Sequence, residues 1–202
     1  LALAAGCCGQ PTKYLEPNRF EPRTNKLRSL FRKRGVQRIY TACPNCTRLL
    51  SALDCARVIP VWETLNRIAV PEDFFNYDGA AFALHDPCPV RQDRAQQDAV
   101  RALLEKANVA VTEFPRNRGE TVCCGNIAML RATDPAKSAA MRTGRLHELP
   151  PELRVTSYCA GCVDAFRSEG RDSAHLVELL FGTSRARGWG NRIRNTIQSR
   201  KD

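Results

Sequence analysis

Ten cysteines are the residues of this 202-residue chain whose type and spacing could do chemistry. Nine of them occur as adjacent pairs, as C-x-x-C pairs or directly after an Asp-Pro dipeptide. They are Cys7, Cys8, Cys43, Cys46, Cys88, Cys123, Cys124, Cys159 and Cys162. Such groupings are typical of metal ligation or thiol redox chemistry in a reducing compartment rather than of structural disulfides. Cys55 stands alone on an apolar stretch that resembles a helix, so we expect it to be a small buried hydrophobe.

The cysteines repeat along the chain. Cys7-Cys8-Gly9 and the C-x-x-C pair that ends at Cys46 recur 116 residues later as Cys123-Cys124-Gly125 and the pair that ends at Cys162. A repeat at a fixed offset indicates two copies of one structural unit. Cys88 extends the second copy to C-x34-CC-x34-C-x-x-C, and its equivalent in the first copy would precede Leu1. We therefore expect the first copy to be truncated at its N-terminus.

The segments around the cysteines follow an α/β pattern. Runs of β-branched and aromatic residues at 37–42 and 153–158 are expected to be strands. Each would lead through a C-x-x-C pair into a helix, around 47–53 and 163–168. Further strands are expected at 80–85 and 109–114, and helices at 94–108 and 136–149. Strand–helix–strand order predicts parallel pairing, so the expected fold is α/β, with two tandem related units that contain short parallel sheets.

Changes in composition along the chain divide it into two units and a tail. A turn-rich segment at 71–79 is expected to link a first unit at 1–78 to a second at 79–182, and a basic tail follows at 183–202. The net charge of +10 comes from this tail and from residues 13–38. Two roles for these basic segments remain open. They could dock to an acidic partner or an anionic membrane surface, or they could form a solvated face that offsets thiolate charge. Nucleic-acid binding is disfavoured because no zinc-finger spacing, RNP-like motif or aromatic-interleaved basic patch occurs.

The number of cysteines in the second copy favours one kind of ligand. Zinc takes four ligands, whereas this copy offers five sulfurs, at Cys88, Cys123, Cys124, Cys159 and Cys162. Adjacent cysteines tend to diverge, so they suit different irons of a polynuclear cluster better than one ion. Gly125 lets the backbone turn closely around inorganic sulfide, and a helix start at the C-x-x-C pair would favour thiolates. A zinc-stabilised interaction module remains the alternative from another class.

With these motifs, residues 1–182 resemble the CCG cysteine-rich domain family. That domain occurs in heterodisulfide reductases, both in multi-subunit complexes and in their single-chain relatives, and in iron–sulfur subunits of glycolate and lactate oxidation complexes. In the family, a complete five-cysteine motif can hold a noncubane [4Fe-4S] cluster. The resemblance implies one cluster on the five sulfurs of the second copy. It implies a second on Cys7, Cys8, Cys43 and Cys46, with a fifth ligand from a preceding segment.

The resemblance also implies a function. We expect an oxidoreductase subunit of the heterodisulfide-reductase type, which carries electrons through one or two clusters and reduces a small-molecule or protein disulfide. The alternative is the electron-transfer subunit of a flavin-linked 2-hydroxyacid oxidising complex. Ferredoxin-like or flavoprotein subunits would be its partners, because no nucleotide-binding fingerprint follows a strand. The expected location is the cytoplasm, with peripheral contact at the inner face of the membrane through the basic tail.

Histidines are the remaining candidates for chemistry. His85 lies three residues before Cys88, and the ordinary pKa of imidazole is near neutrality. It is therefore the candidate catalytic residue, as a proton donor to a leaving thiolate. The alternative for His85 is that it only caps a strand end or turn. His147 and His175 are expected to be surface or packing residues.

Overall fold

The computed structural model describes residues 7–68 and 77–182. Most of the expected linker at 71–79 and all of the basic tail at 183–202 lie outside these residues. The first half holds α1 (Gln10–Leu15), α2 (Pro17–Lys33), β1 (Arg38–Thr41), α3 (Pro44–Ser51), β2 (Arg57–Pro60) and α4 (Val61–Arg67). The second half holds β3 (Ala81–His85), α5 (Arg94–Lys106), β4 (Ala110–Glu113), α6 (Leu130–Thr133), α7 (Pro135–Leu146), β5 (Arg154–Ser157), α8 (Ala160–Arg167), β6 (Ser173–His175) and α9 (Leu176–Phe181).

The strands form two parallel sheets, as the sequence predicts. β1 pairs with β2, and the larger sheet has the order β4-β3-β5-β6 with every pair parallel. The four expected strands correspond to β1, β3, β4 and β5. The helices after the C-x-x-C pairs begin three residues earlier than expected, because Pro44 and Ala160 already belong to the first turn. Each C-x-x-C pair therefore spans the start of a helix.

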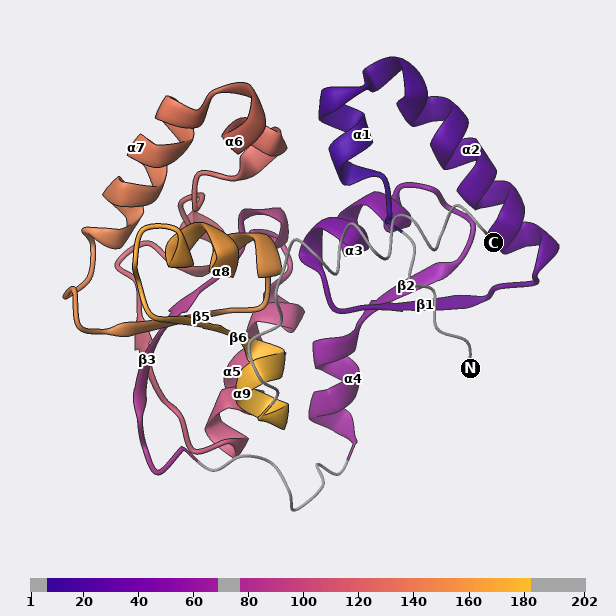
Figure 1. Ribbon diagram of the computed structural model, residues 1–202. Helices are drawn as coiled ribbons and strands as arrows, with labels where there is room; N and C mark the ends of the chain where they lie inside the picture. The colour runs from indigo at the N-terminus through magenta and orange to yellow at the C-terminus, as the bar shows by residue number, and fades with distance from the viewer. Residues whose placement is uncertain (1–6, 69–76, 183–202) are drawn as a thin grey trace.

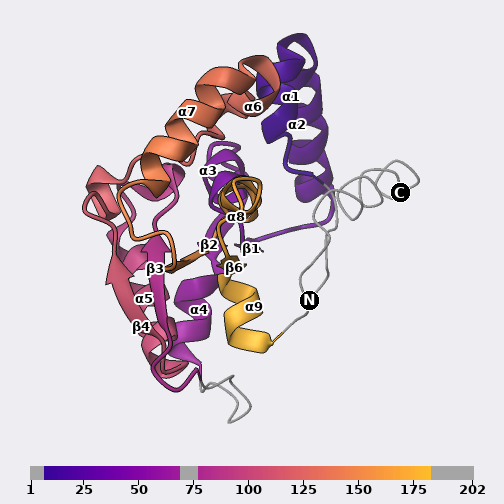
Figure 2. The ribbon, with the colours of Figure 1, turned by 60° about the vertical axis from the view of Figure 1, so that its left-hand side comes forward.

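The two halves repeat one structure at the offset seen in the sequence. β1 and α3 have the same lengths as β5 and α8, which lie 116 residues later. Figure 1 shows α1 and α2 over one unit and α6 and α7 over the other, and Figure 2 also places α1 beside α6. The second unit in addition contains β3, α5 and β4. The expectation of an α/β fold with tandem related units is confirmed.

The larger sheet separates two cores. Alternate residues of a strand point to opposite faces. Phe82 and Leu84 of β3 belong to a cluster built with α5 and α9. Ala83 packs in a second cluster with α7, α8 and the buried cysteines of the second copy. The cysteines of this unit therefore gather on one face of the sheet.

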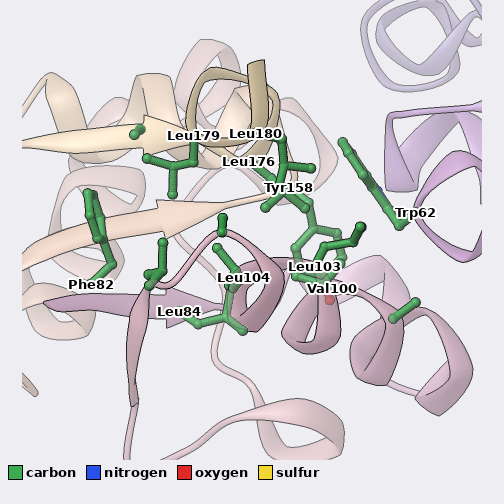
Figure 3. Close-up of a cluster of buried hydrophobic side chains, with 14 of the residues drawn as sticks. Trp62, Phe82, Leu84, Val100, Leu103, Leu104, Tyr158, Leu176, Leu179 and Leu180 are labelled. Atoms are coloured by element: carbon green, nitrogen blue, oxygen red, sulfur yellow. The ribbon is translucent and has the colours of Figure 1, made fainter. Parts of the chain in front are cut away.

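A helix of the first half completes the other core. Trp62 of α4 is fully buried, and its ring makes a T-shaped contact with Tyr158 at 6.5 Å. Figure 3 shows Trp62 together with Tyr158, Leu103 and Leu176. Because α4 also packs along α5, the two units share this core, which sets their cysteines beside one another.

The basic segment at residues 13–38 lies on α1, α2 and β1. Most of its positive side chains are exposed, among them Arg19, Lys26 and Arg32. In the part of the chain that the structure describes, no helix combines the length and apolar character that a bilayer crossing requires.

Candidate metal centre

Three strands lead directly into cysteines at their carboxyl ends, one in the smaller sheet and two in the larger. β1 and β5 lead into Cys43 and Cys159, which are the N-cap residues of α3 and α8. β3 leads through Asp86 and Pro87 into Cys88, where a short 3-10 turn begins. Carboxyl ends of parallel strands are where α/β folds place their ligands. The C-x-x-C pair lies at this end of the sheet in each unit.

Backbone N–H groups point at sulfur in the same way in both copies. The Cys159 sulfur accepts from the N–H of Cys162, and the Cys43 sulfur accepts from the N–H of Cys46. The Gly9 N–H donates to the Cys7 sulfur at 3.5 Å, and the equivalent Gly125 N–H donates to Cys123. N–H groups at a helix start or tight loop favour the anionic thiolate.

Gly125 holds the CCG loop of the second copy against α7. Its φ is +87°, and a Cβ at this position would lie 2.3 Å from the backbone oxygen of Ser138. The Ser138 hydroxyl donates to the Gly125 carbonyl at 2.8 Å. Only a residue without a side chain allows the loop to lie this close to α7. The packing therefore explains why a glycine follows the paired cysteines.

The nine cysteines of the repeated motifs form one continuous chain in which each thiol interacts with the next. The Cys124 and Cys162 sulfurs lie 3.1 Å apart. The equivalent residues Cys43 and Cys159 contact each other and join the two copies. The order along the chain of contacts is Cys7, Cys8, Cys46, Cys43, Cys159, Cys162, Cys124, Cys123 and Cys88. The cysteine sets of the two copies, which are far apart in the sequence, therefore lie beside one another.

Three of these thiols have a lowered pKa, namely Cys8, Cys43 and Cys123. Hydrogen bonds from Cys124 and Cys88 lower the pKa of Cys123 to about 2, against the opposing effect of burial. Hydrogen bonds from Cys46 and Cys7 lower the pKa of Cys8 to about 4 in the first copy. The pKa of Cys88 is raised above its ordinary value, first because its thiol donates to Cys123. Each copy thus holds a thiolate at neutral pH, the form that binds metals.

The spread of the sulfurs argues against a single zinc ion. Tetrahedral zinc requires four ligand atoms that are all about 3.8 Å from one another, given its bond lengths. Within residues 7–68 and 77–182, the three-residue set whose donor atoms all lie within 4.8 Å of one another is His85, Cys124 and Cys162. Each of the other thiols interacts with its neighbour in the order given above. This donor set fits a group with several metal atoms better than one ion.

Cys55 lies outside the chain of thiols. It occupies a bend between α3 and β2, so the expectation that it lies on a helix is wrong. It packs, partly buried, against the cluster formed by Leu49, Leu50 and Leu53, which agrees with its expected role as a small hydrophobe.

His85 is the last residue of β3 and is fully buried between the rings of Phe114 and Phe166. Burial, followed by the charge of Arg145, lowers its pKa to about 3. The sequence-based reason for a proton donor was a pKa near neutrality, and the pKa of the buried ring lies below that range. His147 is exposed at the end of α7, and His175 caps α9.

Sequence reasoning missed three polar residues around the thiols. Asp86 is fully buried and accepts hydrogen bonds from Arg101 at 2.8 Å and from the Tyr158 hydroxyl at 2.8 Å. Burial raises the pKa of Asp86, but Arg101 outweighs this effect and the net pKa is lowered. Asn45 donates to the Cys159 sulfur at 3.9 Å. Asp86 precedes Cys88 by two residues and Asn45 lies within the first C-x-x-C pair, so nearness to a cysteine was the signal available for both.

The third residue that sequence reasoning missed is Arg145 of α7, which donates to His85 at 3.4 Å. The two residues are 60 positions apart. No local pattern connects them, so only the packing of α7 on the sheet could reveal the contact.

Comparison with known families agrees with this geometry. The family model of the cysteine-rich domain, CCG, matches residues 2–51 and 82–167. The chain belongs to the CCG cysteine-rich domain family. No sequence among the curated proteins matches it. The family and the gathered thiols together indicate a site for a metal or iron–sulfur group.

Proposed function

We propose that the chain is an iron–sulfur redox subunit of the heterodisulfide-reductase type. It holds one or two [4Fe-4S] clusters, receives electrons from a ferredoxin-like or flavoprotein subunit, and reduces a disulfide. The observation that carries the proposal is the continuous chain of nine thiols, which runs through both copies and contains no disulfide. A structural zinc site would need only four of these residues.

Each copy supplies its own ligands under this proposal. Cys88, Cys123, Cys124, Cys159 and Cys162 hold one cluster, and Cys7, Cys8, Cys43 and Cys46 contribute to the other. When bound, such clusters supply one-electron transfer at iron ligated by sulfur. The contact between Cys43 and Cys159 gives electrons a short path between the two sets.

Exposure of the sulfurs differs in a way that suits a redox substrate. Cys123, Cys124, Cys159 and Cys162 are buried, whereas Cys7, Cys43, Cys46 and Cys88 are partly exposed. The buried sulfurs shield one side of the group from water. The partly exposed ones leave a side where a disulfide could approach.

The reaction is balanced by two electrons and two protons for each disulfide. The sulfur–sulfur bond breaks and two thiols form, with electrons that arrive one at a time from the partner subunit. The exposed arginines and lysines of α2 are suited to dock an acidic redox partner. A cytoplasmic location, with peripheral membrane contact through residues 183–202, is part of the same proposal.

A reoxidation experiment tests the proposed reaction. The chain is reconstituted anaerobically with iron and sulfide, reduced with dithionite, freed of excess reductant and mixed with bis(2-hydroxyethyl) disulfide. We expect the cluster absorbance to return as the disulfide is consumed, and two thiols to appear per disulfide. The apoprotein at the same concentration measures the background from thiol exchange. Reoxidation by ferricyanide but not by disulfide would contradict the reductase function and favour an electron relay.

A further inference from the structure

The tautomer of His85 can be assigned from its contacts. Its Nδ1 lies 3.4 Å from the Nε of Arg145. A guanidinium group carries only donors, so Nδ1 must be the acceptor and has no proton. The ring therefore carries its proton on Nε2.

Arg145 is itself held in place. Its side chain is fully buried and pairs with Glu148 at 2.5 Å. It also donates to the Arg116 carbonyl at 2.8 Å, and its guanidinium lies 3.9 Å from the centre of the Phe114 ring. With these partners occupied, the guanidinium keeps one N–H directed at His85, which fixes both the ring orientation and the tautomer.

The Nε2 of His85 is buried and has no hydrogen-bond partner among the described residues. A nitrogen of this ring and the sulfurs of Cys124 and Cys162 all lie within 4.8 Å of one another. Because Nδ1 is engaged with Arg145, Nε2 is the nitrogen left for these sulfurs. A buried N–H group without an acceptor is unfavourable, so this donor points to an acceptor that binds beside the two cysteines.

We propose that His85 donates its Nε2–H to sulfur at the second set of cysteines and raises the reduction potential of the group held there. Arg145 is the positioning residue, since it fixes the tautomer. A hydrogen bond to sulfur stabilises the reduced, more negative state. A ligand role would need a bare Nε2 and a proton on Nδ1, which would face the N–H of Arg145. This inference rests on the proposed iron–sulfur function.

Two substitutions of His85 separate a donor from a ligand. Glutamine keeps an N–H close to the position of Nε2, whereas methionine fills the space without one. In the reconstituted full chain, we expect both variants to keep the iron content. His85→Met should shift the cluster potential to a more negative value by a tenfold change in the reduction equilibrium, ~59 mV for one electron. His85→Gln should stay closer to the unchanged protein. Equal potentials in all three proteins, or loss of iron from both variants, would overturn the inference.

A measurement without the cluster separates this inference from the proposed function. Nitrogen-15 NMR of the 202-residue chain before reconstitution should show His85 with its proton on Nε2, and Arg145→Met should give a mixture of tautomers. A proton on Nδ1 in the unchanged chain would overturn the inference even if iron binds. Failure of the unchanged chain to bind iron would instead reject the proposed function, and with it the acceptor for His85.

Discussion

Serine at Cys123 or at Cys124 is expected to abolish iron–sulfur binding by the second set of cysteines. Cys123 contacts Cys88 and Cys124, and the Cys124 sulfur lies 3.1 Å from that of Cys162. Both residues are almost fully buried, so water or another side chain cannot easily replace the lost sulfur. A serine oxygen is a harder and smaller ligand than a thiolate. Iron and inorganic sulfide per chain after anaerobic reconstitution measure the effect.

Cys55→Ser is the matched control for both substitutions. Cys55 lies in a bend against Leu49, Leu50 and Leu53, away from the chain of thiols. We expect this variant to keep the full iron content and visible absorbance. Equal iron loss in all three variants, or full iron in Cys123→Ser and Cys124→Ser, would contradict the assigned ligands.

Alanine at Gly125 is expected to destabilise the second unit by more than about 4 kcal/mol, a loss that point substitutions rarely reach. The new Cβ would lie 2.3 Å from the backbone oxygen of Ser138, which cannot move without displacing α7. The positive φ of +87° adds the strain that any side chain meets there. Urea unfolding of the full chain, with iron content measured in parallel, reports both the stability and the site.

Gly170→Ala controls for backbone strain alone. Gly170 has a φ of +78°, but nothing lies within 4 Å of a Cβ at that position. Its cost should be about 1–2 kcal/mol, the usual penalty for a left-handed alanine, with iron content unchanged. If the two alanine variants were destabilised equally, close packing of the CCG loop on α7 could not explain why glycine is required at position 125.

The features that sequence predicts best are those that repeat. The 116-residue offset identified equivalent cysteines, and the runs before each C-x-x-C pair identified β1 and β5. β2 and β6 were not predicted because no cysteine motif follows either strand to mark it, and β6 has only three residues. The contact between Cys43 and Cys159 was not foreseen either, because it depends on how the two units meet.

Contacts between distant residues account for what sequence reasoning could not predict. Trp62 belongs to the first half by sequence, but it packs beside Tyr158 in the core of the second. The ordinary pKa of a histidine ring is near neutrality, but burial of His85 between two phenylalanines lowers its pKa to about 3. The contact of His85 with Arg145 spans 60 residues. Tertiary packing decides all three features.

The central claim is that the nine gathered cysteines hold iron and sulfide. The most direct test is the simultaneous determination of iron, acid-labile sulfide and zinc in the full chain after anaerobic production and reconstitution. We predict iron and sulfide in equal amounts, a brown absorbance and no stoichiometric zinc. Stoichiometric zinc without iron or sulfide would contradict the claim and identify a zinc-stabilised module instead.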